Sequence, residues 1–480
     1  MSEFDLRQRA RLLRQLSRRE LFSRLGMGAS ALALTALLAE EARAEAPPAE
    51  GANPMAPRPP HYAPKAKRVI YLFQNGGPSQ VDLFDPKPEL NRRAGEKPGE
   101  GFVNDVDPKK TGVWLGTPFQ FARHGQSGLE LSELLPELAK HADSVSVIRS
   151  MVSEHENHEQ ACCHMHSGSP VAGRPTMGSW ITYALGTENQ DLPAYVALLN
   201  PGGLPVDGAR NWSSGWMPPL YQGMPVRATD TSPILNLEPK VPRDAAGARL
   251  ELLQKLNREH RKGREDNLEL EARIANFELA ARMQLAATDA LDLSKEPATT
   301  RALYGLDQGE TATYGRQCLM ARRLVERGVR FVQVMMAGQP WDTHANNTEG
   351  HRSLCRQTDL PVAGLLADLK QRGLLDETLV VWTGEFGRTP FAEGKDGRDH
   401  HKRGFSMWLA GGGIKGGVTH GATDEFGYRA VQDVVTVADL HGTLLHLLGL
   451  DHKRVTFRHG NRDERLTDVH EAQLLKSLLA

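Results

Sequence analysis

Short apolar runs alternate with amphipathic stretches along most of the chain. Six runs rich in aliphatic and aromatic residues have the composition of buried β-strands: residues 69–73, 145–148, 194–198, 329–334, 379–382 and 405–409. Apolar residues recur with helical spacing at 131–141, ahead of Gly328 and at 360–370. Strands separated by helices predict an α/β fold with a mostly parallel sheet covered on both faces.

The segment from about residue 245 to 287 interrupts this alternation. It is rich in Leu, Glu and Arg, and its apolar residues recur with helical spacing. This pattern predicts a helical insertion that leaves the sheet.

Composition narrows the function classes. Lys plus Arg (58) and Asp plus Glu (59) nearly cancel in the 480 residues. The chain therefore lacks the basic excess of nucleic-acid-binding proteins, and we expect no nucleic-acid partner. Its four cysteines are too few for a disulfide scaffold in a chain of this length.

The N-terminal region has the pattern of an export signal. The pair Arg18-Arg19 precedes an apolar run at 25–38, and Ala42 and Ala44 provide the small residues that signal peptidase recognises. The paired arginine indicates the twin-arginine pathway. We therefore predict a signal peptide at 1–44, a flexible linker at 45–66 rich in Ala and Pro, and one α/β domain at 67–480.

The predicted signal has consequences for location. Its apolar run is short for a membrane span, so we expect no stable span after cleavage. The alternatives are an uncleaved anchor and a buried N-terminal helix. If the signal is used, the twin-arginine export machinery is a partner and the protein is periplasmic or secreted. Cargo of this pathway folds before export, often around a metal or cofactor.

Carboxylates and histidines gather at the ends of four predicted strands, and such ends meet at one edge of a parallel sheet. Their oxygen and nitrogen atoms suit zinc, manganese and related divalent ions. The candidate ligands are Asp82 after the first strand, Asp342 and His344 after the fourth, Glu385 after the fifth, and His400 and His401 before the sixth.

Each of these motifs also has a plainer interpretation. Asp342 could cap a turn, and Glu385 could form a structural ion pair with Arg388. His400 and His401 could be solvated loop histidines. Their joint placement at strand ends favours the metal site over these separate explanations.

A second group of histidines follows the second predicted strand. Their spacing allows either metal ligation or a polar loop that enters a helix, and the functional interpretation is strongest for His158. The group comprises His155, His158, His164 and His166.

The chain contains five long motifs: GGPSQVDLFDPKP at 76–88, WDTH at 341–344, GEFGRTP at 384–390, GRDHH at 397–401 and ATDEFG at 422–427. With these motifs the sequence resembles a bacterial family of uncharacterised, twin-arginine-exported, sulfatase-like proteins. The resemblance runs from about Lys67 to the C-terminus. It implies membership of the alkaline phosphatase and sulfatase superfamily, a three-layer α/β/α sandwich and a divalent metal (zinc, manganese or calcium) at the strand ends.

The resemblance carries over residue roles only in part. Asp342, His344 and one of His400 or His401 match the expected metal ligands. However, Asn75 stands where an Asp is expected, and Phe386 where a His is expected.

The position of the expected nucleophile differs as well. Where the superfamily has Ser, Thr or a modified Cys, counting back from Gly168 gives His158. Either His158 is a nucleophile or ligand, or water activated at the metal attacks, or the site no longer catalyses.

Two functions from different classes follow. The first is an exported metal-dependent hydrolase of phosphate or sulfate esters, small or polymeric, in which Arg388 stabilises the charge of the ester oxygens. The second is a non-catalytic binding protein on the same fold that recognises a sulfated or anionic polymer. A weaker third hypothesis is a partner module for other exported enzymes.

Overall fold

The structure is a computed structural model that describes residues 53–105, 107–228, 233–234, 243–262, 264 and 268–480. The predicted signal peptide lies outside these residues. The compact unit spans Pro54–Ala480. It begins earlier than the predicted residue 67, because the backbone N–H groups of Lys65 and Ala66 donate to the carbonyl of Leu447 at 2.8 and 2.9 Å. The part of the predicted linker that is described therefore packs on the domain.

An eight-stranded sheet forms the centre, in the order β12-β4-β11-β8-β1-β7-β5-β6. All neighbouring strands pair in parallel except β11, which is antiparallel to both β4 and β8. The strands are β1 (Arg68–Phe73), β4 (Val145–Met151), β5 (Tyr195–Leu199), β6 (Met224–Arg227), β7 (Phe331–Met335), β8 (Thr378–Thr383), β11 (Phe405–Ala410) and β12 (Thr419–His420).

All six strands expected from the sequence are present in this sheet. The short edge strands β6 and β12 are additional, and each lacks the long apolar run that marks the others. The segment 131–141 differs from the prediction. It contains the end of β3 (Leu129–Ser132) and the start of a 3₁₀-helix (Leu138–Ser144) in place of an amphipathic α-helix.

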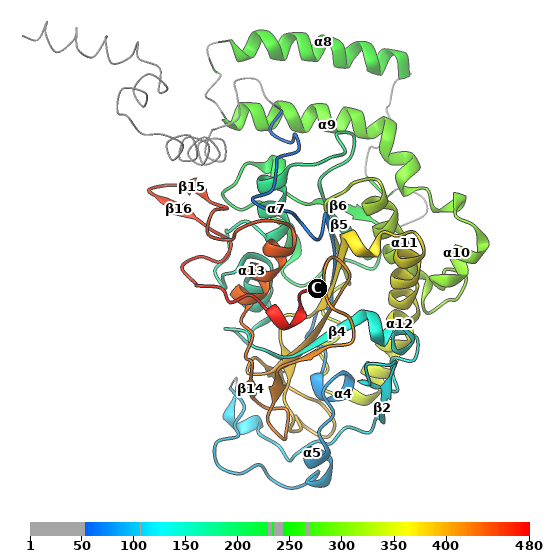
Figure 1. The fold of residues 1–480 in the computed structure, drawn as a ribbon, viewed down its shortest axis with the longest axis vertical. Coiled ribbons are helices and arrows are strands. Elements are labelled where there is room, and N and C mark those ends of the chain that lie inside the picture. The colour runs from blue at the N-terminus through cyan, green and yellow to red at the C-terminus, as the bar shows by residue number, and fades with distance from the viewer. Residues whose placement is uncertain (1–52, 106, 229–232, 235–242, 263, 265–267) are drawn as a thin grey trace, which may run out of the picture. The chain divides into compact units, whose positions relative to one another are not determined.

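Helices cover both faces of the sheet, so the predicted three-layer α/β/α sandwich is confirmed. Figure 1 shows α11 and α12 on one side and α7 and α13 on the other. The helices are α4 (Gln80–Leu83), α5 (Pro88–Arg92), α6 (His158–Ser167), α7 (Met177–Leu185), α8 (Arg243–Arg261), α9 (Leu268–Leu291), α10 (Ala298–Leu303), α11 (Ala312–Glu326), α12 (Asn347–Gln371) and α13 (Val437–Leu447).

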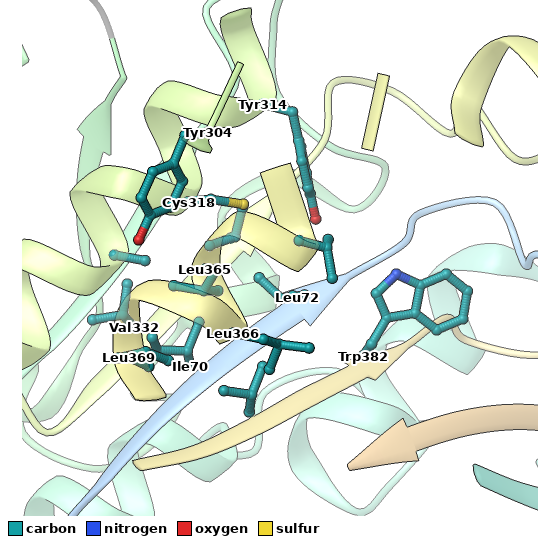
Figure 2. Packing of buried hydrophobic residues seen from close by; sticks show 14 of the residues in the cluster. Ile70, Leu72, Tyr304, Tyr314, Cys318, Val332, Leu365, Leu366, Leu369 and Trp382 are labelled. Atoms are coloured by element: carbon teal, nitrogen blue, oxygen red, sulfur yellow. The ribbon is translucent and has the colours of Figure 1, made fainter. Parts of the chain in front are cut away.

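The core lies on the two faces of β1 and its neighbours. Ile70 and Leu72 point to one face, where Figure 2 shows them beside Leu365, Leu369 and Cys318 from the covering helices. The alternate residues of β1 pack on the opposite face. A central parallel strand is buried on both sides, which explains why β1 reads as a continuous apolar run.

The predicted helical insertion is confirmed as α8 and α9, which lie side by side in Figure 1. Within the described residues, four small two-stranded sheets complete the fold. No helix in this part of the chain is long and apolar enough to cross a membrane. These sheets pair β2 (Phe121–His124) with β3, β9 (Gly387–Arg388) with β10 (His400–His401), β13 (Ala422–Thr423) with β14 (Ala430–Gln432), and β15 (Phe457–His459) with β16 (Arg462–Glu464).

Candidate metal centre

Most of the predicted site residues meet at the edge of the sheet where the parallel strands end. Asp342 and His344 follow β7, Glu385 follows β8, and His158 is the first residue of α6 after β4. His400 precedes β11. It reaches the same edge because β11 is antiparallel, so its start lies beside the end of β8.

Three imidazole rings converge on the carboxylate of Asp342. Nε2 of His344 and Nε2 of His400 each lie 3.0 Å from Asp342 Oδ1. Nε2 of His158 lies 3.2 Å from Asp342 Oδ2. The two Nε2 atoms of His344 and His400 are themselves 3.0 Å apart. Four potential ligand groups therefore face one small volume.

Glutamates hold the other ring nitrogen of two of these histidines. Nδ1 of His158 lies 2.6 Å from Oε1 of Glu385, which also accepts the backbone N–H of Gly76 at 2.8 Å. Nδ1 of His344 is hydrogen-bonded to Glu393. Metal-binding histidines usually have such a partner, because it fixes the tautomer and turns the free nitrogen toward the ion.

His400 provides the clearest tautomer. Its Nδ1 lies 2.6 Å from the backbone carbonyl oxygen of Glu156. A carbonyl can only accept a hydrogen bond, so Nδ1 carries the proton. Nε2 of the neutral ring then directs a lone pair at Asp342 Oδ1 and at His344 Nε2. A positive charge near these atoms, either a metal ion or a proton on Nε2 of His344, relieves the repulsion that this lone pair would otherwise meet.

The donor set fits a divalent metal. Two groups of side chains place ligand atoms within 4.8 Å of one another: His158, Asp342 and His400, and His344, Asp399 and His400. Nε2 of His158 is buried and makes no hydrogen bond of normal geometry. Imidazole nitrogens with a carboxylate are typical of zinc and manganese sites, whereas calcium takes oxygen ligands. The chemistry of the site thus disfavours calcium among the three ions expected from the sequence.

Burial and the charges of neighbouring groups shift the pKa values of the three histidines and of Asp342. Burial opposes protonation of His158, but Asp342 and Glu385 outweigh it and raise the pKa of this ring to about 9. A hydrogen bond with Asp342 raises the pKa of His344, whereas burial lowers the pKa of His400. Burial also disfavours the charged form of Asp342, yet its three histidine partners and Arg388 lower the pKa of the carboxyl far below its usual range.

Arg388 lies at the centre but not in the role expected from the sequence. Its side chain is fully buried, and Nη2 contacts Asp342 Oδ1 at 2.7 Å. Nε donates to the carbonyl of Gly77 at 2.9 Å, and further N–H groups donate to the carbonyls of Gly76 and Arg398. Arg388 thus ties the turn after β1 to Asp342, and its bonds leave it poorly placed to stabilise the oxygens of an ester.

Asp82 is not brought to the cluster. It is completely buried on α4, where the guanidinium of Arg398 contacts it at 2.8 Å and the amide of Asn347 donates to it at 2.9 Å. Arg398 already neutralises this carboxylate, so the expectation that Asp82 completes a second metal site is corrected.

His401 also points away from the centre. His400 and His401 form β10, in which adjacent side chains face opposite sides. His400 therefore reaches Asp342, while Nε2 of His401 is hydrogen-bonded to the carbonyl of Tyr428. The sequence left open which of the two is a ligand, and the strand geometry selects His400.

The remaining histidines of the second group are not ligands of this cluster. Nδ1 of His164 lies 3.4 Å from the backbone nitrogen of Glu154, and the His166 ring packs on Phe73. Only His158, at the start of α6, joins the centre. Sequence reasoning did not find the orienting roles of Glu393 and of the Glu156 carbonyl. Glu393 lies in a loop rich in charged residues, where no pattern distinguishes one glutamate from another. A backbone carbonyl is present in every residue, so no sequence pattern can identify it.

Comparison with known proteins gives low similarity to solved structures. The lipoteichoic acid synthase LtaP from Listeria monocytogenes is 9% identical, with a TM-score of 0.38 over 84% of this chain and 75% of that one. The PsFucS1 sulfatase from Pseudoalteromonas sp. is 13% identical, with a TM-score of 0.34 over 80% and 68% of the two chains. The alkaline phosphatase from the Antarctic bacterium TAB5 is 11% identical, with a TM-score of 0.31 over 81% and 99%.

No curated protein matches the sequence. A family match covers nearly the whole domain, from residue 66 to residue 479. The chain belongs to the family described as "Protein of unknown function (DUF1501)".

Proposed function

We propose that this protein is an exported, metal-dependent hydrolase of phosphate or sulfate esters. The ligands are Nε2 of His158, His344 and His400 together with the carboxylate of Asp342. The observation that carries the proposal is the convergence of three Nε2 atoms on Asp342 while each Nδ1 is held by an acceptor. Zinc or manganese suits this donor set best.

A divalent ion held there supplies Lewis-acid polarisation of an ester oxygen. The chain's own residues hold that centre in place. Glu385, Glu393 and the Glu156 carbonyl keep the three rings in one tautomer, and Arg388 anchors Asp342. The side chain of His344 is 37% exposed, so substrate and water approach from its side.

Water is the attacking group in this proposal. The start of α6, where the resemblance expects a Ser, Thr or Cys, holds His158. Its Nδ1 is bonded to Glu385 and its Nε2 faces Asp342, and both contacts support the role of a ligand over that of a nucleophile. Cys162 lies one turn later, fully buried, and burial raises the pKa of its thiol well above the usual value. A buried neutral thiol is a poor nucleophile.

The route of export is part of the same proposal. The twin-arginine pattern at 1–44 supports folding and metal loading before export to the periplasm or the exterior. A fusion of residues 1–66 to a reporter tests this, with Arg18→Lys plus Arg19→Lys as the variant. Export that persists in the double variant would rule out the twin-arginine machinery as the partner.

A second candidate function is a binding protein for a sulfated or anionic polymer. Two observations favour it: all three nitrogens of the Arg388 guanidinium group donate to protein groups, and no hydroxyl or thiol occupies the start of α6. A partner module for other exported enzymes is a third candidate, and subunits that co-purify would support it.

Elemental analysis of the purified protein tests the metal centre first. We expect close to stoichiometric zinc or manganese in the wild type and its loss in Asp342→Ala, His344→Ala and His400→Ala. His470→Ala, an exposed histidine outside the cluster, is the matched control. Metal with turnover of aryl phosphates or sulfates supports the hydrolase; metal without turnover supports the binding protein. Absence of metal after incubation with zinc and manganese would refute the metal-dependent hydrolase and leave the binding protein as the better account.

A further inference from the structure

The two ligand groups of the centre share one atom. His400 belongs to both, and its Nδ1 is bonded to the Glu156 carbonyl, so only Nε2 can bind a cation. An imidazole nitrogen has one lone pair and binds one ion at a time. The two groups therefore cannot both be filled through His400.

Four carboxylates surround these ligands. Asp342 contacts all three imidazoles, Glu385 holds His158 and Glu393 holds His344. Asp399 Oδ1 lies 3.6 Å from Nδ1 of His344. Their side chains are between 0 and 16% exposed, so solvent screens their charges poorly.

The imidazoles are neutral when they bind a metal. Two further side chains in the described part of the chain bring positive charge to these carboxylates. Arg388 contacts Asp342 at 2.7 Å, and Nζ of Lys110 lies 2.7 Å from Glu393 and 3.6 Å from Asp399. Other basic groups nearby are already paired. Arg398 is bound to Asp82 at 2.8 Å, and Lys402 to the carboxylate of Glu156 at 2.6 Å.

Four negative carboxylates and two positive side chains give the protein part of the centre a net charge of minus two. One divalent ion brings the sum to zero. A neutral centre accommodates one additional negative charge far better than two, because the buried carboxylates repel the second and Arg388 has its donors engaged by the protein.

We propose that the centre selects ester groups that carry a single negative charge, namely sulfate monoesters and phosphate diesters, over doubly charged phosphate monoesters. This inference rests on the proposed function, since it needs the metal-loaded centre. The shared chemistry is a tetrahedral oxyanion of charge minus one. Lys110 is the more exposed of the two cations: its side chain is 42% exposed, whereas that of Arg388 is buried.

Equilibrium binding of two analogues that cannot be hydrolysed tests the inference without any turnover. Benzylsulfonate and benzylphosphonate have the same aromatic group and tetrahedral head, but at a pH where the phosphonate is fully ionised they differ by one charge. Titration calorimetry on the zinc-loaded protein should give at least about tenfold tighter binding of the sulfonate. Lowering the pH until the phosphonate is singly charged should narrow that gap.

Variants of two neighbouring lysines provide the control. Lys110→Gln removes a charge from the rim and should weaken the phosphonate more than the sulfonate. Lys109→Gln changes an exposed neighbour by the same charge and should leave both affinities close to wild type.

The outcomes separate this inference from the proposed function. Tighter binding of the phosphonate by the zinc-loaded protein, or equal binding of the two analogues, overturns the charge selection while the metal centre stands. Protein that cannot be loaded with metal refutes the proposed function itself. Among substrates, aryl sulfates and methyl aryl phosphates are then compared separately to tell the two singly charged classes apart.

Discussion

Gly397 gives a direct test of the metal centre because it touches no ligand atom. It follows the turn that carries Glu393, and its Cα faces the backbone of His344. A Cβ at this position would lie 1.8 Å from the carbonyl oxygen of His344 and 2.2 Å from its carbonyl carbon. Real Cβ contacts stay above 3.0 Å, so Gly397→Ala must move the two segments apart by about 1.2 Å. Functional sites tolerate about 0.5 Å of displacement, so His344 should lose its position as a ligand.

The expected magnitude follows from the ligand count. Loss of one of four ligands should exceed the 10- to 100-fold effect typical of a lost orienting partner, so we expect zinc affinity to fall by at least about 100-fold. At a zinc concentration of 100 times the wild-type Kd, the metal stabilises the wild type by about 2.7 kcal/mol, but the variant by only about 0.4 kcal/mol. The metal-free variant should itself be less stable by about 1–3 kcal/mol through overpacking.

Thermal unfolding with and without zinc, combined with calorimetric zinc titration, measures both quantities. Gly309→Ala is the matched control, because a Cβ there meets no atom within 4 Å and its φ is not positive. If Gly397→Ala folds and binds zinc as tightly as the wild type, then His344 is not a ligand and the proposed centre is wrong.

Three further outcomes are expected. Glu385→Gln keeps the shape of the side chain but removes the charge behind His158, so zinc affinity should fall by about 10-fold or more in calorimetric titration, and an unchanged affinity would contradict the orienting role. Asp82→Ala leaves the buried guanidinium of Arg398 without its partner and should cost about 3–5 kcal/mol in denaturant unfolding, with little change in zinc affinity per folded molecule. Stability should fall as the pH drops from 6.5 toward 4, because burial lowers the pKa of several histidines to about 3–4 and only the unfolded chain takes up their protons there. Each contributes up to about 1.4 kcal/mol per pH unit, and a flat stability profile across this range would contradict the burial argument. These histidines are His166, His351 and His441.

The sequence predicted the layers of the fold well, because buried parallel strands have a local signal. The apolar runs at 69–73 and 379–382 are β1 and β8 within one or two residues. The prediction of a helix at 131–141 was wrong. The apolar spacing there matches a helix, but Leu131 pairs with Ala122 in a short β-hairpin. Pairing with a neighbouring strand can override the local periodicity of a segment, and the local pattern does not reveal which strand it will pair with.

The candidate site was predictable in composition but not in pairing. Carboxylates and histidines at strand ends indicated a metal centre, and three of them, Asp342, His344 and His400, converge in the structure together with His158 from the second histidine group. Asp82 was indistinguishable from a ligand by sequence, because its partner Arg398 lies 316 residues away. The antiparallel direction of β11 could not be predicted from the sequence either, although it decides whether His400 reaches the other candidate ligands.

That single reversed strand also bears on the order in which the centre assembles. Because β8 and β11 are antiparallel neighbours, the connection 384–404 leaves and returns at one edge of the sheet and folds on itself through β9 and β10. Glu385, Glu393 and His400 all lie on this one connection. Its closure spans about twenty residues, whereas contact with His158 spans more than two hundred. Contacts between residues close in sequence form faster than contacts between distant ones. We therefore expect the connection 384–404 to be structured before α6 docks, so that His400 is the first ligand in place for the metal during folding.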